Sequence, residues 1–365
     1  MISENRHNSQ LNMPEESSPF IPPGERPKRR VRYQGTHPRR FAEKYKEHNL
    51  DRYSADVARV VASGKTPAGT HLPILVEEIL SWLDPRPGQI VADCTLGYGG
   101  HARELLKRIL PGGRLIGLDV DPIELPKTEA RLRRMTDSPD TLRIHRSNFA
   151  GLPQILARDE IEGVDAILAD LGVSSMQIDD PVRGFTFKAD GPLDLRMNPE
   201  RGQPASAFLA SLDLVKLADL LRENSDEPRA DRIAEAILKR NESTPLRTTK
   251  ALAGCIRAAL PGVRKDDADT TIRRVFQALR IAVNDEFDAL ETFLRNLPAC
   301  LKSGGKVAIL TFHSGEDRRV KKFFEAGRGR GDYSGIADEV IRPGPAELRG
   351  NPRSSPAKLR WAVRA

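Results

Sequence analysis

The chain has 365 residues, of which 39% are hydrophobic and 30% are charged, and its formal net charge is +7. This composition is typical of a soluble globular protein with one large α/β domain and a smaller one. No run approaches about 18 uncharged apolar residues, and the N-terminus lacks an apolar signal-peptide core, so the sequence predicts neither a membrane-spanning nor a secreted protein. Cys94, Cys255 and Cys300 have no metal-ligand spacing, so we expect reduced thiols, no metal and a cytoplasmic location.

Basic residues gather at both ends of the chain. Residues 21–50 contain nine Lys and Arg against three acids, and the stretch from Arg328 to the end is also basic. Two basic flanks indicate a polyanionic partner such as nucleic acid. Residues 1–70 are rich in Pro, Ser and charge, which predicts a disordered extension, with a helical pattern over 41–62. A merely solvated tail is the alternative interpretation of this extension.

Strand and helix patterns alternate from residue 71 onward. Apolar runs that predict buried strands lie at 89–94, 114–119, 142–145, 164–170, 305–312 and 358–363. Amphipathic patterns at 101–110 and 122–135 predict helices between the first of them. The alternation stops between about 177 and 280, where the pattern is helical. We therefore expect an α/β fold with a mainly parallel, doubly wound sheet formed by 71–177 and 281–365, and an inserted helical subdomain at 178–280.

The loop after the first predicted strand has the pattern of a cofactor site. Asp93 ends the strand, Gly97, Gly99 and Gly100 follow, and Asp119 ends the next strand, where a carboxylate can accept hydrogen bonds from a ribose. The spacing fits a dinucleotide fingerprint as well as an S-adenosylmethionine site. A pyrophosphate has no need of an acid at Asp93, whereas S-adenosylmethionine carries a cationic amino-acid end. The loop therefore favours S-adenosylmethionine.

Several longer motifs follow in a fixed order. They are Asp170-Leu171-Gly172-Val173-Ser174-Ser175-Met176-Gln177, Arg183-Gly184-Phe185-Thr186-Phe187, Asp190-Gly191-Pro192-Leu193-Asp194-Leu195-Arg196-Met197, Phe276-Gln277-Ala278-Leu279-Arg280, Phe312-His313-Ser314 and Asn351-Pro352-Arg353-Ser354. Together they resemble the bacterial ribosomal RNA small-subunit methyltransferase H family, over about residues 71–364. The resemblance implies a class I, Rossmann-like methyltransferase that transfers a methyl group to the N4 amine of a cytidine in the decoding region of 16S rRNA.

The resemblance also implies roles for particular residues. The resemblance implies that the cofactor contacts include Gly99, Gly100, His101, Asp119, Phe149, Asp170 and Gln177. The loop pattern above adds Asp93 and Gly97 to this set. Asp170 follows the fourth predicted strand, where amino-methyltransferases place acceptors for the target amine, so it is also our catalytic candidate. It could instead serve only the cofactor.

The target base must leave its stack to reach a methyl donor, so aromatic and basic residues near the site are candidates for RNA contacts. Phe185 and Phe187 could stack on the base, although both could instead belong to the core. The other expected substrate residues are Arg183, Asp194, Arg196, His313, Ser314, Arg353 and Lys358, and the arginines and the lysine could meet RNA phosphates.

The expected partner is 16S rRNA in the small ribosomal subunit or its precursor, with no membrane and with a homodimer left open. An RNA-binding ribosome-assembly factor with a residual cofactor pocket is an alternative function. Another S-adenosylmethionine-dependent nucleic-acid methyltransferase and a dehydrogenase on a dinucleotide-binding fold are two further alternatives. The acids Asp93, Asp119 and Asp170 argue against lost chemistry.

Overall fold

A computed structural model describes residues 73–136 and 138–365. The expected N-terminal extension at 1–70 and the helical pattern at 41–62 lie outside the described residues. Among the described helices, none has the length and apolar character needed to cross a membrane.

A seven-stranded sheet forms the centre of the protein, with the strand order β3-β2-β1-β4-β5-β7-β6. The first five strands in this order are parallel, and β7 runs antiparallel to both β5 and β6. The strands are β1 (Ile90–Asp93), β2 (Arg114–Asp119), β3 (Leu142–Arg146), β4 (Val164–Asp170), β5 (Leu301–Thr311), β6 (Tyr333–Ile336) and β7 (Lys358–Arg364). The predicted α/β fold with a mainly parallel sheet is confirmed.

Helices cover both faces of this sheet, because each parallel strand returns to the next through a crossover. One face packs on α3 (Val76–Leu83), α4 (Gly100–Ile109) and α5 (Leu125–Leu132). The other face packs on α6 (Leu152–Arg158), α13 (Glu286–Cys300) and α14 (Ser314–Arg330). The strands are therefore buried on both sides, which explains why they read as continuous apolar runs in the sequence.

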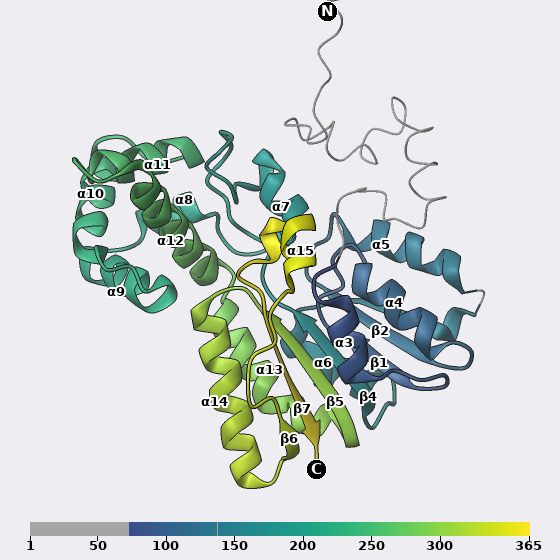
Figure 1. Cartoon of the computed structure of the whole chain (residues 1–365). Coiled ribbons are helices and arrows are strands. Elements are labelled where there is room, and N and C mark those ends of the chain that lie inside the picture. Colours follow the sequence, from purple (N-terminus) through teal and green to yellow (C-terminus); the bar gives the residue numbers. More distant parts are fainter. Residues whose placement is uncertain (1–72, 137) are drawn as a thin grey trace, which may run out of the picture.

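A group of helices stands beside the sheet, on the left in Figure 1. Its members are α8 (Ala205–Ala210), α9 (Leu214–Ser225), α10 (Ala230–Ser243), α11 (Thr249–Ala258) and α12 (Lys265–Val283). Their inward faces form a hydrophobic cluster of their own. This is the helical insert that the sequence predicts, although its boundaries at 178 and 280 stay a prediction.

The start of the insert differs from the expectation of continuous helix. After α7 (Ser175–Asp179), the chain has only a single 3-10 turn (Pro181–Arg183) before α8 begins at Ala205. Gly184 takes a φ of +75°, and a Cβ at Gly191 would lie 1.9 Å from the carbonyl oxygen of Pro181. Backbone this close to backbone requires glycine, so the segment folds as a tight loop instead of a helix. A short α15 (Pro345–Gly350) lies before β7.

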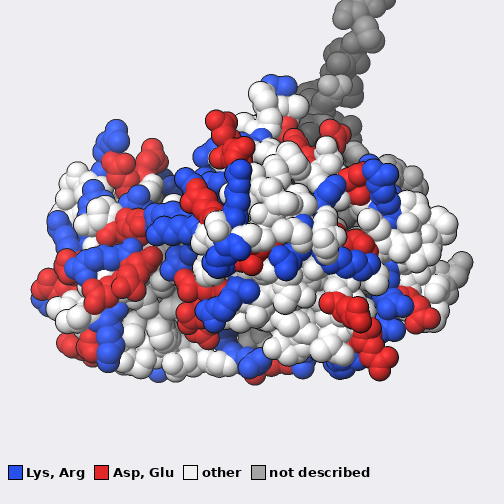
Figure 2. Space-filling model, turned by 90° about the horizontal axis from the view of Figure 1, so that it is seen from below, with Lys and Arg blue, Asp and Glu red and all other residues white. Residues whose placement is uncertain are grey.

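Charged side chains are mixed on the face of the molecule seen in Figure 2. Lysine and arginine alternate there with aspartate and glutamate, with apolar and neutral areas between them. Opposite charges that are interspersed cancel one another at distances beyond about 10 Å in salt solution. The net charge of +7 therefore does not make this face a strongly positive field.

Candidate active site

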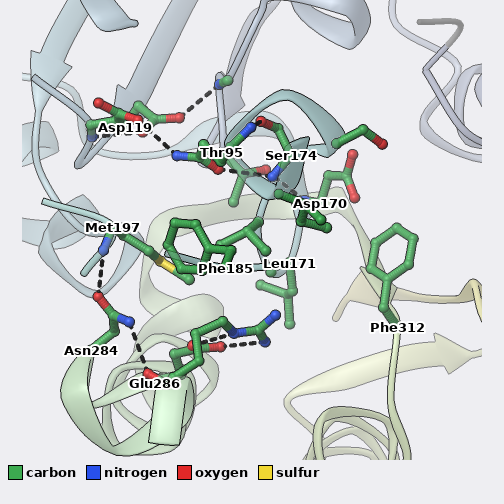
Figure 3. A pocket seen from close by; sticks show the side chains of 18 of the residues that line it. Thr95, Asp119, Asp170, Leu171, Ser174, Phe185, Met197, Asn284, Glu286 and Phe312 are labelled. Carbon is green, nitrogen blue, oxygen red and sulfur yellow. Dashed lines mark hydrogen bonds and ion pairs between the residues drawn. The ribbon is translucent and has the colours of Figure 1, made fainter. Parts of the chain in front are cut away.

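A cavity of about 670 Å³ lies at the edge of the sheet where the parallel strands end. The loops after β1, β2 and β4 line one side, and the start of the insert, α12 and the loop before α14 line the other. Figure 3 shows Asp119 and Asp170 at the strand ends, with Phe185 and Met197 across from them. This edge is where open α/β sheets bind ligands, and the cavity has the size of a small-molecule site.

The glycine loop joins β1 to α4. Gly99 precedes the helix with a φ of +74°, and a Cβ there would lie 2.9 Å from the Cγ2 of Thr128. The Gly97 N–H donates to Oδ2 of Asp119 at 2.7 Å, so the loop is tied to the end of β2. Gly97, Gly100 and His101 line the cavity, whereas Gly99 is turned toward α5. Gly99 therefore shapes the loop, and its expected contact with a cofactor stays a prediction.

Asp119 brings a half-buried carboxylate to the cavity wall. Its Oδ1 accepts from the Asp121 N–H at 2.9 Å, and burial raises its pKa above the usual value despite this hydrogen bond and the one from Gly97. A carboxylate oxygen has more than one lone pair, so each oxygen can still accept from a ligand. This geometry suits the ribose role that the sequence predicts, which stays a prediction.

We expect Asp119→Ala to weaken S-adenosylmethionine binding by about 1.5–3 kcal/mol, roughly 10- to 150-fold, because hydrogen bonds to a charged group are lost. Titration calorimetry on the folded variant measures the loss. Asp140→Ala is a control, because Asp140 lies on the exposed turn before β3 and should leave the affinity unchanged. An Asp119→Ala protein with wild-type affinity would show that Asp119 does not contact the cofactor.

The ionisable side chains of Asp93, His101 and Asp170 lie near one another at the cavity wall. His101 Nε2 lies 2.9 Å from the carbonyl oxygen of Ile74, which can only accept, so this nitrogen carries the hydrogen. Burial lowers the pKa of His101, and the unprotonated Nδ1 of the neutral ring lies 3.6 Å from Oδ2 of Asp170. Asp93 is buried and does not line the cavity; burial raises its pKa to about 6. Asp93 can therefore act on a ligand only at a distance, through its charge.

Asp170 lies at the end of β4 and faces the cavity. Its backbone N–H donates to Thr95 Oγ1 at 2.6 Å, which links β4 to the loop after β1. Burial, and secondly the negative charge of Glu316, raise the pKa of Asp170 to about 7. A carboxylate whose pKa lies near neutrality can accept or release a proton under cellular conditions, as a general base must.

Phe149 and Gln177 both line the cavity, as expected for cofactor contacts. Phe149 lies at the start of the turn after β3 and packs against Phe293 of α13, with ring centroids 5.3 Å apart. Gln177 and Ser174 form a capping box at the start of α7, and Gln177 Nε2 donates to Asp121 Oδ2 at 2.8 Å. Its amide is therefore fixed by the protein itself.

Four of the expected substrate residues line the cavity, namely Phe185, Phe187, His313 and Arg353. Phe185 is buried and stands at the centre of Figure 3, and Phe187 is half-buried against Phe276 at a ring distance of 5.7 Å. Each ring packs in the hydrophobic cluster of the insert and also faces the cavity. A place in the core is therefore compatible with stacking on a base, which stays a prediction.

The other five expected substrate residues do not line the cavity. Each of them makes an ion pair or a hydrogen bond with another side chain of the protein. Arg183 is buried and pairs with Asp121 at 2.7 Å, so its charge is already engaged within the fold. The remaining four are held by neighbours: Arg196 by Asp194, Lys358 by Asp317 and Ser314 by Asp226. A cation that is already paired with a carboxylate contributes little binding free energy to a phosphate, because the existing ion pair has to be given up.

Other residues of the cavity were not predicted from the sequence. Arg280 donates to both oxygens of Glu286, at 2.7 and 2.9 Å, and Asn284 Oδ1 accepts from the Met197 N–H at 2.7 Å. Glu316 Oε2 accepts from the Phe312 N–H at 2.8 Å. The only sequence signal for Glu316 is its position three residues after His313, at a helix start, where acids are common.

Glu286, His313 and Glu316 also have ligand-type atoms within 4.8 Å of one another. Such a set could hold a divalent cation. However, Arg280 already occupies both oxygens of Glu286, and a fixed positive charge beside a metal ion opposes its binding. We therefore interpret the set as a charge network in the cavity wall and assign no metal to it.

The loop that carries Phe185 gives a test of this architecture. Gly184→Ala would place a Cβ 2.2 Å from the carbonyl oxygen of Pro192, in addition to the cost of a positive φ. Gly202→Ala is a matched control, because Gly202 has a φ of +66° and nothing within 4 Å of the added atom. We expect Gly184→Ala to lose at least about 1–3 kcal/mol more free energy of unfolding than the control. Equal losses in chemical denaturation would contradict the described loop.

Comparisons with known proteins show the family of this chain. Residues 68–365 match the model of the MraW methylase family. The chain is 48% identical to ribosomal RNA small subunit methyltransferase H 1 of Lachnoclostridium phytofermentans over 343 residues, 93% of each chain. It is 49% identical to methyltransferase H 2 of Alkaliphilus metalliredigens, over 93% of this chain and 99% of that one. The chain therefore belongs to the MraW methylase family.

Proposed function

We propose that this protein transfers a methyl group from S-adenosylmethionine to the N4 amine of a cytidine in the decoding region of 16S rRNA. The observation that carries the proposal is the single cavity that joins Asp119, at the cofactor end, to Asp170 and the aromatic rings of the insert. Its relatives with up to 49% identity bear the name ribosomal RNA small subunit methyltransferase H.

The residues present fit S-adenosylmethionine. The cofactor has two positive groups, a sulfonium and an ammonium, and the cavity wall contains the carboxylates of Asp119, Asp121 and Asp170 with the charge of Asp93 beneath. Asp119 would hold the ribose, Phe149 would pack on the adenine, and Gly97, Gly100 and His101 would lie along the amino-acid end. When bound, the cofactor supplies a methyl group that is activated by the positive sulfur.

The chain contributes mainly position and charge to the reaction. The lone pair of a cytosine amine is delocalised into the ring, so an acceptor for its N–H improves the nucleophile. As the new N–C bond forms and the S–C bond breaks, the amine must lose one proton. Asp170 would take this proton, because it lines the cavity and its pKa is about 7. Holding the amine in line with the methyl group supplies much of the remaining rate.

The target base must be turned out of the RNA to enter the cavity. Phe185 and Phe187 are the aromatic residues of the insert that could hold its face, and His313 also lines the cavity. Stacking on one aromatic ring contributes about 1–3 kcal/mol per base. The insert would therefore form the side of the cavity that holds the RNA base.

Nucleoside mass analysis tests the proposal directly. Small subunits from cells that lack the protein are incubated with the purified protein and S-adenosylmethionine, and the 16S rRNA is digested. We expect N4-methylcytidine from one site in the decoding region. Only 5-methylcytidine, or methyl groups only on protein, would overturn the assignment. Tight binding of cofactor without turnover would instead favour an assembly factor with a residual pocket.

We further propose a cytoplasmic location, since the substrate is the small subunit or its precursor. A homodimer is the finer proposal about assembly, and sedimentation of the full chain across a concentration series tests it. A mass that stays that of one chain would exclude the dimer under those conditions.

A further inference from the structure

The cavity has an acidic interior and a basic rim. Six acids line it: Asp119, Asp121, Glu124, Asp170, Glu286 and Glu316. A phosphate that entered would meet this negative charge, so the backbone of a bound RNA must stay at the rim. The lysines and arginines that line the cavity are Arg131, Lys188, Arg273, Arg280 and Arg353.

Three of these five cations are already engaged by the protein. Arg280 pairs with Glu286 at 2.7 Å, and Arg353 pairs with Asp179 at 2.6 Å. Arg131 donates to Thr128 Oγ1 at 2.6 Å and lies over the ring of Tyr98. A phosphate could bind each of these arginines only in competition with the contact that it already makes within the protein.

Lys188 and Arg273 differ from the other three. Both are exposed. Within the described part of the chain, neither has a carboxylate within ion-pair distance, and Arg273 donates only to Thr270 Oγ1 at 3.2 Å. An exposed cation outside any ion pair can neutralise an RNA phosphate, which releases the counterions condensed on that phosphate.

Each of the two cations lies close in the chain to one of two aromatic rings that touch each other. Lys188 follows Phe187 in the chain, and Arg273 precedes Phe276 by three residues, on the same face of α12. The ring centroids of Phe187 and Phe276 lie 5.7 Å apart. This ring contact joins the two chain segments that carry Lys188 and Arg273 at the rim. Arg257 also lies over Phe187, at 5.8 Å, but it pairs with Asp269.

We propose that Lys188 and Arg273, near the Phe187–Phe276 ring pair, hold the RNA phosphates next to the target cytidine. The inference rests on the proposed function and assigns the phosphate contacts within it. It replaces the expected contacts of Arg183, Arg196 and Lys358, whose charges are neutralised inside the fold. Aromatic rings between cations are the arrangement by which proteins hold single-stranded nucleic acid.

The salt dependence of RNA binding tests this assignment. Binding of a 16S rRNA transcript of the decoding region is measured for the full chain between low and physiological salt. Lys188→Gln and Arg273→Gln are each expected to lower the slope of log affinity against log salt by about 0.7, and the double variant by about 1.4. On small subunits, KM for the RNA should rise while kcat and the affinity for S-adenosylmethionine stay near the wild-type values.

Two matched variants serve as controls. Arg222→Gln removes an exposed arginine that pairs with Asp219 at 2.7 Å, and Lys321→Gln removes an exposed lysine that pairs with Glu325. Both should keep the wild-type slope. A double rim variant with an unchanged slope, or controls that lower the slope as much, would overturn the assignment. If the proposed function itself is wrong, the wild-type protein forms no N4-methylcytidine, whatever the slopes.

Discussion

Arg183→Met is expected to lower the free energy of unfolding by about 3–5 kcal/mol, the cost of breaking a buried ion pair by removing one partner. The Arg183 guanidinium is 7% exposed and the Asp121 side chain only 1%. Arg183 also donates to the carbonyl oxygen of Met197 at 2.7 Å. Methionine fills much of the volume, but it leaves the carboxylate of Asp121 with the Gln177 amide and backbone N–H donors alone.

Urea denaturation of three variants separates the buried charge from a general loss of packing. Arg222→Met breaks exposed ion pairs on α9 and should cost less than about 1 kcal/mol. Asp121→Leu combined with Arg183→Met removes both charges and should cost less than Arg183→Met alone. A loss below about 1 kcal/mol for Arg183→Met would show that Asp121 does not depend on this partner. An unchanged salt slope for RNA binding would separate Arg183 from the phosphate contacts.

The sheet could be predicted from the sequence because its strands are buried on both faces. The runs Arg114–Asp119 and Val164–Asp170 were predicted with their observed bounds, and the other parallel strands within a few residues. The edge strand β6 was not predicted. Tyr333–Ile336 has four residues, including a serine and a glycine, and its register with β7 shifts. A strand this short at an edge has no apolar run that would identify it.

Side-chain partners could not be predicted, because they depend on residues far apart in the sequence. Arg183 and Asp121 are separated by 62 positions, and Lys358 and Asp317 by 41. A motif predicts that an arginine is near a site, but only the packed structure shows whether its charge is free. This is why the candidate cofactor residues mostly line the cavity, whereas five of the nine candidate substrate residues do not.

The second large effect concerns turnover. Asp170→Asn keeps the size of the side chain and removes its negative charge, so we expect kcat to fall by about 100-fold or more, as for loss of a general base. Cofactor affinity should change little if Asp170 acts on the amine. If Asp170 serves only the cofactor, the affinity should fall and turnover should recover at saturating S-adenosylmethionine. Single-turnover rates with small subunits measure the difference.

The pH profile gives an independent test of the same residue. Burial raises the pKa of Asp170 to about 7, and a base must be ionised to accept a proton. In the free enzyme, kcat/KM should therefore rise with pH to a plateau above about 7. A bound positive cofactor would lower the pKa of this acid, so the step in kcat should lie at lower pH. Asp170→Asn should lack both steps.

Stability should change with pH in the opposite sense. The pKa of Asp170 in the folded protein, about 7, lies above the ordinary value of 3.8, so the folded state holds a proton that the unfolded state releases. Its contribution to stability is fully present below about pH 4 and is lost as pH rises toward 7. Asp170→Asn carries no titrating group, so relative to wild type it should gain stability between pH 4 and pH 8. A constant difference in the free energy of unfolding across this range would show that Asp170 is already ionised in the folded protein. An ionised Asp170 can still accept a proton, but a rise of kcat/KM near pH 7 would then have to come from a group other than Asp170.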